Sequence, residues 1–223
     1  MSGLSDRMVS VAVPGRSGEP DLSRLPAERS PVIDALVTLL CRESKTSNLS
    51  IIRSRLIELG PSALPCLDLV AASAALDESD AARVVALEIR RRLLDAEWDR
   101  WMNRSDADLE TGALLIDRFG DPTRDVSRVS QRIDALAFEL ERRLAHAPDT
   151  GRMISTMTTY LFEEIGFQGN TDSYDDPDNS YLSCVLERKL GIPVSLSVVM
   201  LLIADRLELP LVGIGMPGHF IVR

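Results

Sequence analysis

The feature that most constrains this chain is a helical run near its end that is apolar on every side. Between Ser195 and about residue 207 the run begins SLSVVMLLIA, which leaves no polar face for solvent. A helix of this kind has to be buried all round, so we expect it at the centre of a core. Two short strands are predicted after it, at 211–215 and 219–222, joined by a Pro-Gly turn. The sequence thus predicts an α+β fold, mostly α, with a central buried helix and a short antiparallel β ribbon.

From about residue 30 to the apolar helix the chain is predicted to be mainly helical, and the strand signal begins only at Leu211. The clearest periodicity lies between Val126 and Leu144, where apolar residues recur every three or four positions and predict one buried stripe. Earlier in the chain, Gly60-Pro61 is expected to separate two helices. A longer helix from about residue 78 to 104 is expected to have one apolar side, formed by Val84, Leu87, Leu94, Trp98 and Trp101.

These patterns predict three segments. Residues 1–29 mix Ser, Gly, Pro and charges without periodicity, which indicates a flexible arm. Residues 30–104 are expected to form a helical module, and both a HEAT-like hairpin and an ordinary helical bundle fit the pattern. Residues 105–223 are expected to form the core around the apolar helix.

Charge and composition argue against two classes of partner. The net charge of −9 argues against a nucleic-acid binder, which needs a basic face for phosphates. No apolar run reaches the roughly 20 residues that a membrane-spanning helix needs. Cys41, Cys66 and Cys184 are odd in number and widely spaced, which favours reduced thiols and a cytoplasmic location.

The residues that suggest chemistry are Ser195, Ser197 and His219. The two serines lie in the first turn of the apolar helix, where the positive helix end favours a nucleophile, and His219 opens the last strand. A Ser–His pair is one interpretation, although serine needs a strong adjacent base. The alternative is that Ser195 caps the helix and His219 is a partly buried, hydrogen-bonded histidine. Gly191 is expected to end the preceding helix in the left-handed conformation.

No metal or cofactor site is expected. The segment 171–179 holds four aspartates, but its spacing does not fit a calcium loop, and no Gly and no closing Glu stand where that loop needs them. Asx-turns and a helix N-cap at Asp178, Asn179 or Ser180 explain these residues better than a calcium loop does. The two histidines of the chain have no cysteine beside them and give no zinc pattern.

Three runs of sequence resemble one known family. They are FEEIGFQGNTDSYDDPDNSYL, LERKLGIPVSLSVVMLLIADRLELPL and GIGMPGHFIVR, preceded by DLETGALLIDRFGDP. Together they resemble the bacterial transglutaminase-like proteins of the SirB type, often described as transglutaminase-like with a TPR tail. The resemblance covers roughly residues 105–223.

The resemblance implies a papain-like transglutaminase fold. Active members of that superfamily use a Cys at the start of the central helix, a His on a following strand and an Asp on the next strand. His219 matches the His, whereas the Cys position near 193–197 offers only Ser195 and Ser197. Cys184 falls in the preceding helix and does not match. Because the chain ends at Arg223, the resemblance implies that the core lacks its last strands, the Asp strand included.

Two functions follow as expectations. The first is a non-catalytic, cytoplasmic protein that binds an unknown protein partner or regulates it. The alternative is a papain-like hydrolase or acyl transferase that uses Ser195 or Ser197 with His219. We also expect self-association or fraying at the edge of the last strand, because an unpaired edge recruits other chains.

Overall fold

The computed structural model describes residues 30–43, 45–73, 76–145, 147 and 149–223. The flexible arm expected at 1–29 lies outside the described residues. The chain divides into two compact units, one up to Ile89 and one from Arg90 onward. This division falls inside a helix and earlier in the chain than the boundary expected at residues 104 and 105.

The first unit is helical, as the sequence predicts. Pro31 occupies the first turn of the first helix, where its fixed φ suits a helix start. Gly60 has a positive φ of 62° at the end of the second helix, so it forms the corner before Pro61. The elements are α1 (Pro31–Arg42), α2 (Thr46–Leu59), η2 (Gly60–Ala63), α3 (Leu64–Ser73) and the start of α4 (Leu76–Met102).

Helix α4 buries the expected face only in part. Leu94 is 0% exposed, as expected, but Val84 is 54% exposed, and Val85 and Ala86 are buried in its place. The expected stripe fails at Val84 because small alanines contribute to the buried face and carry little hydrophobic signal. Helix α1 packs against α2 and α3 in this unit.

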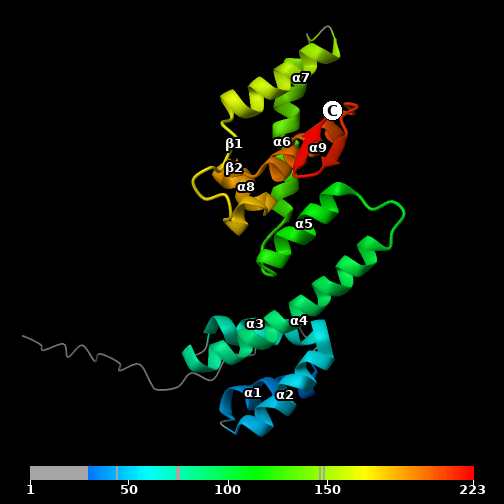
Figure 1. Ribbon diagram of the computed structural model, residues 1–223. Coiled ribbons are helices and arrows are strands. Elements are labelled where there is room, and N and C mark those ends of the chain that lie inside the picture. Colours follow the sequence, from blue (N-terminus) through cyan, green and yellow to red (C-terminus); the bar gives the residue numbers. More distant parts are fainter. Residues whose placement is uncertain (1–29, 44, 74–75, 146, 148) are drawn as a thin grey trace, which may run out of the picture. The chain divides into compact units, whose positions relative to one another are not determined.

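The second unit contains the other helices that the structure describes, together with short strands (Figure 1). The 126–144 periodicity is confirmed, since Val129, Ile133 and Leu140 are buried on one face of their helix. The helices are α5 (Leu109–Gly120), α6 (Ser127–Leu144), α7 (Thr150–Thr158), η3 (Thr159–Glu164), η4 (Pro177–Asn179), α8 (Leu182–Arg188) and α9 (Pro193–Arg206). The strands are β1 (Gln168–Gly169), β2 (Leu190–Gly191), β3 (Gly213–Met216) and β4 (His219–Val222).

Helix α9 is the centre of this unit. It contacts α5, α6, α8, β1, β2 and β4, so helices and strands surround it. Val199, Leu202 and Ile203 are at most 2% exposed. The burial is not complete on every side, because Val194 in the first turn is 40% exposed.

A small parallel pair of strands before α9 was not predicted. Gln168 pairs with Leu190, and Gly169 pairs with Gly191. Gly191 therefore lies in a strand, and the left-handed residue that ends α8 is Lys189, with φ 59° and ψ 23°. A Cβ at Gly191 would approach the Oγ of Ser195 to 2.7 Å, so a close approach explains this glycine, and helix termination does not.

The predicted β ribbon is present at the end of the chain. Strands β3 and β4 are antiparallel, with Met216 paired to His219 across the Pro217-Gly218 turn. Gly218 has a φ of 72°, which an L side chain rarely adopts. The Phe220 ring lies against Gly213 near Leu201, so one face of the ribbon covers α9.

Replacement of Leu202 by Ala tests the central position of α9. Leu202 is 2% exposed, and the substitution should lower the free energy of unfolding by roughly 2–5 kcal/mol through the cavity that it leaves. Urea unfolding followed by circular dichroism measures the loss. The matched control is Val194→Ala on the exposed first turn, for which we expect less than about 1 kcal/mol. Equal losses at the two sites would show that α9 is not enclosed.

Candidate functional site

The site expected from the sequence is the N-terminus of α9, where Ser195 lies in the first turn. Ser195 is buried, at 6% exposed. Its Oγ accepts the backbone N–H of Ile192 at 3.0 Å and donates to the carbonyl oxygen of Asn179 at 2.6 Å. The hydroxyl thus closes the start of the helix and ties it to the preceding loop.

Ser197 is bonded within its own helix. Its side chain is buried, and its Oγ donates to the carbonyl oxygen of Pro193 at 2.7 Å. This back-bond to the residue four positions earlier is common for serine in a helix. The Ser197 hydroxyl proton, which a catalytic base would have to remove, is therefore already hydrogen-bonded to a backbone oxygen.

Two buried asparagines hold the loop over the N-terminus of α9. Asn179 is 0% exposed, and its Nδ2 donates to the carbonyl oxygens of Ser173 and Tyr174. Asn170 donates from Nδ2 to Oδ1 of Asn179 at 3.0 Å. Because buried amides need their partners, this set fixes the loop that supplies the acceptor of Ser195.

His219 is not the partly buried, hydrogen-bonded histidine of the alternative interpretation. It is exposed at the start of β4. Side chains alternate along a strand, and Phe220 and Val222 are the half-buried ones, so His219 and Ile221 lie on the outer face. In the part of the chain that the structure describes, no hydrogen bond joins His219 to Ser195 or to Ser197.

The acidic loop is held by turns and one arginine. The carboxylate of Asp176 accepts the backbone N–H of Asp178 at 3.0 Å and the guanidinium of Arg188 at 2.8 Å. The N–H of Asp178, and then Arg188, lower the pKa of Asp176. The expected Asx-turn is therefore present, but the N-cap of α8 is Tyr181, one position beyond the range expected. No group of three or more possible metal ligands is found among the described residues.

A buried acid that the sequence analysis missed lies in α5. Asp117 is 0% exposed, and its Oδ1 accepts from Nη1 of Arg124 at 2.6 Å and from Oγ of Ser183 at 2.8 Å. Its Oδ2 accepts the backbone N–H of Ser183 at 2.6 Å. Asp117 thus caps α8 from another helix. A signal existed in the sequence, since an acid in the last turn of a helix opposes the helix dipole and needs another partner.

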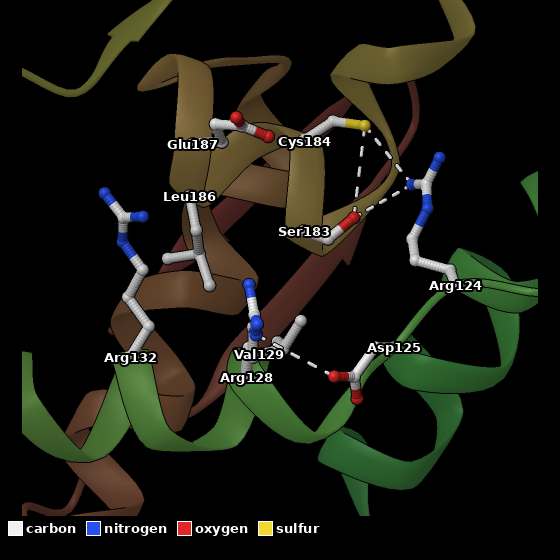
Figure 2. A pocket seen from close by; sticks show the side chains of 9 residues that line it. All are labelled: Arg124, Asp125, Arg128, Val129, Arg132, Ser183, Cys184, Leu186 and Glu187. Carbon is white, nitrogen blue, oxygen red and sulfur yellow. Dashed lines mark hydrogen bonds and ion pairs between the residues drawn. The ribbon is translucent and has the colours of Figure 1, made fainter. Parts of the chain in front are cut away.

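Cys184 lies beside this acid, where burial disfavours its thiolate. Nη1 of Arg124 contacts both its Sγ, at 3.2 Å, and the hydroxyl of Ser183 (Figure 2). Burial raises the pKa of the Cys184 thiol, although the Arg124 charge acts in the opposite direction. Since the thiolate is the reactive form, a raised pKa leaves the residue mostly as thiol near neutral pH.

The second half of the chain is similar in sequence to known proteins. Residues 127–223 match the model of the Transglutaminase-like superfamily. A UPF0162 protein of Xylella fastidiosa is 38% identical over 128 residues, which is 55% of this chain and 46% of the relative. A UPF0162 protein of Vibrio cholerae is 30% identical over 115 residues, which is 52% of this chain and 43% of the relative.

A human protein is also similar in sequence to about half of this chain. F-box only protein 21 of Homo sapiens is 28% identical over 134 residues, which is 50% of this chain and 21% of that protein. The chain spans less than half the length of each of these relatives. No solved structure matches the chain. Residues 127–223, from α6 to the ribbon, therefore form a transglutaminase-like domain.

Replacement of Asp117 by Ala tests its role as the cap of α8. The change leaves Arg124 and the N–H of Ser183 without their acceptor, which should cost roughly 3 kcal/mol of unfolding free energy. The matched control is Asp205→Ala on the exposed side of α9, with an expected change within about 0.5 kcal/mol. Urea unfolding of both variants gives the comparison, and an equal effect would remove Asp117 from this role.

Proposed function

We propose that this protein is a non-catalytic transglutaminase-like protein of the SirB type, with a papain-like core, that acts in the cytoplasm by binding a partner. The observation that carries the proposal is the hydrogen bonding of Ser195. Its hydroxyl donates to the Asn179 carbonyl oxygen at 2.6 Å and accepts from the Ile192 N–H. A catalytic serine has to transfer its hydroxyl proton to a base. The Ser195 hydroxyl proton is instead hydrogen-bonded to a backbone carbonyl oxygen.

The helix end gives little help to a serine. The positive N-terminus of α9 can lower the pKa of a thiol enough to form thiolate, but a hydroxyl starts far higher. Ser197 has its proton on the Pro193 carbonyl, so it offers no better nucleophile. Both candidate serines are thus used in holding the helix.

One observation supports the alternative, a Ser–His hydrolase or acyl transferase. Strand β4 packs along α9, so His219 lies on the strand beside the helix that carries both serines. Before a proton could pass between Ser195 and His219, the Ser195 side chain would have to rotate away from Asn179. The His219 ring would also have to turn from the outer face of the ribbon toward α9. Catalytic hydrogen bonds are often formed only with substrate bound, so the alternative needs a direct test.

Covalent labelling separates the two functions. The full chain is incubated with a fluorophosphonate and with iodoacetamide, and labelled peptides are mapped by mass spectrometry. We expect no stoichiometric label at Ser195 or Ser197 in the folded protein. Labelling at Ser195 that disappears on unfolding and in His219→Ala would reverse the proposal. Ser197→Ala is the control, because it removes a neighbouring hydroxyl and leaves the Asn179 contact in place.

The relatives fit a binding module. The similar segment occurs in bacterial proteins and also makes up about a fifth of the longer human F-box only protein 21. A segment that recurs within chains of different lengths is expected of a unit that works with other segments. Within the described residues, no helix has the length and apolarity to cross a membrane.

We infer that one partner is a second copy of this chain, joined through the outer edge of β4. Val212 and Arg223 exchange both backbone hydrogen bonds, and such pairs alternate along an antiparallel ladder. The N–H and C=O groups of Phe220 and Val222 therefore point away from β3. Across the described ranges β4 pairs with β3 alone, so this edge is open to another strand.

Hydrogen exchange and light scattering test the edge. As protein concentration rises, the amides of Phe220 and Val222 should become protected and the scattering mass should increase. Val222→Pro removes an outward N–H without touching the β3 ladder, so it should keep the protein monomeric. Ile221→Pro is the contrast, because it breaks the ladder itself. A monomer at every concentration, with both amides as protected as that of Leu202, would exclude this edge as an interface.

A further inference from the structure

A groove with arginines along one wall lies between the first half of α6 and helix α8 (Figure 2). Its volume is about 610 Å³. The volume lies within the range of roughly 300–1,000 Å³ typical of small-molecule sites. Val129 and Leu186 line it as buried apolar side chains, at 4% and 1% exposed. These two side chains form the floor of the groove and are almost wholly covered, so a ligand would meet mainly the longer side chains around them, including the carbon chains of the arginines.

Two arginines on α6 line this groove without strong partners. Arg128 and Arg132 lie one helical turn apart, a spacing at which like charges repel each other. Arg128 approaches Asp125 only at 3.8 Å, with both side chains largely exposed. Arg132 forms no ion pair with any residue that the structure describes. Their placement does not stabilise the helix, so it calls for another explanation.

The third arginine has a different role. Nη1 of Arg124 donates to Asp117 at 2.6 Å and contacts Ser183, and its guanidinium lies 5.4 Å from the centre of the Tyr181 ring. Its charge is balanced by the buried Asp117, so it shapes the groove wall and adds little net charge. The positive charge available to a ligand therefore comes from Arg128 and Arg132.

The groove also contains two acids. The carboxylate of Asp125 accepts hydrogen bonds from the hydroxyl and the backbone N–H of Ser127. These hydrogen bonds lower the pKa of Asp125. Glu187 is exposed on α8, on the opposite wall. The negative charge of Glu187 weakens the attraction of the arginines for an anion. Removal of that charge should therefore strengthen anion binding.

We propose that this groove binds a small organic anion. A phosphate or carboxylate group lies between the guanidinium groups of Arg128 and Arg132, which match both anions in geometry. The apolar body of the ligand lies along the carbon chains of these two arginines, above the nearly covered Val129 and Leu186. The inference does not depend on the proposed function, because none of Ser195, Ser197 and His219 lines the groove.

Titrations of the full chain followed by two-dimensional NMR test the groove. The probes are phenyl phosphate, benzoate, inorganic phosphate and uncharged benzyl alcohol, so that the type of anion and the apolar body are tested separately. We expect saturable shifts at Val129 and Leu186, with phenyl phosphate or benzoate binding more tightly than inorganic phosphate or benzyl alcohol. The stronger of the two aromatic anions identifies the preferred anionic group.

Charge variants give the decisive comparison. Arg128→Gln and Arg132→Gln should each weaken binding of the preferred probe about fivefold, the loss of one exposed charged contact. Glu187→Gln should tighten it about twofold, since a like charge is removed at short range. Arg142→Gln is the matched control on the same helix, because Arg142 pairs with Glu139 and does not line the groove.

The opposite outcomes would overturn the proposal. One is the absence of saturable shifts in the wild-type protein with every anionic probe. Another is equal weakening in Arg132→Gln and Arg142→Gln, which would show a general charge effect. A third is tighter binding of benzyl alcohol than of both aromatic anions, which would show an apolar site. Circular dichroism of each variant confirms that these surface changes leave the fold intact.

Discussion

The second unit depends on the enclosure of α9. A helix with so few polar residues is stable in water only when other elements cover it, and here α5, α6, α8, the short strands and the ribbon all contact it. Its first turn brings backbone N–H groups into the same dry region, where each needs an acceptor. The hydroxyl of Ser195 accepts one of the nearby donors and is itself held by Asn179. The packing of the helix therefore determines what its serines are able to do.

The sequence predicted the elements whose signal is local. The stripe of α6 and the Pro-Gly turn at Gly218 both follow from periodicity or from the backbone preference of one residue. The role of Gly191 was predicted wrongly, because glycine can be required at a position for either of two reasons. Glycine permits a left-handed backbone, and it also permits another group to pack closely against the backbone. The second reason applies to Gly191, since the Ser195 side chain lies against it. Lys189 takes the left-handed conformation in its place.

The candidate site was predicted less completely because its contacts join distant parts of the chain. The bond from Ser183 to Asp117 spans 66 positions, and no local pattern reports such a pair. The exposure of His219 depends on which face of the ribbon covers α9, and Phe220 decides that through its contact with Gly213. A shift of one residue in a strand would have reversed the outcome. The sequence thus identified candidate residues by their type, but it did not predict their burial or their hydrogen-bond partners.

The polar groups of this domain divide into those that hold the fold and those that remain available. Asp117, Asn179 and Ser195 are buried and satisfied, so a change in any of them would cost stability before it altered function. Arg128 and Arg132 are different, because they lie at the surface of a groove and neither is strongly paired. Functional side chains are commonly ones that the fold does not need. On that physical ground the groove, more than the serines of α9, is where binding by this domain should be sought.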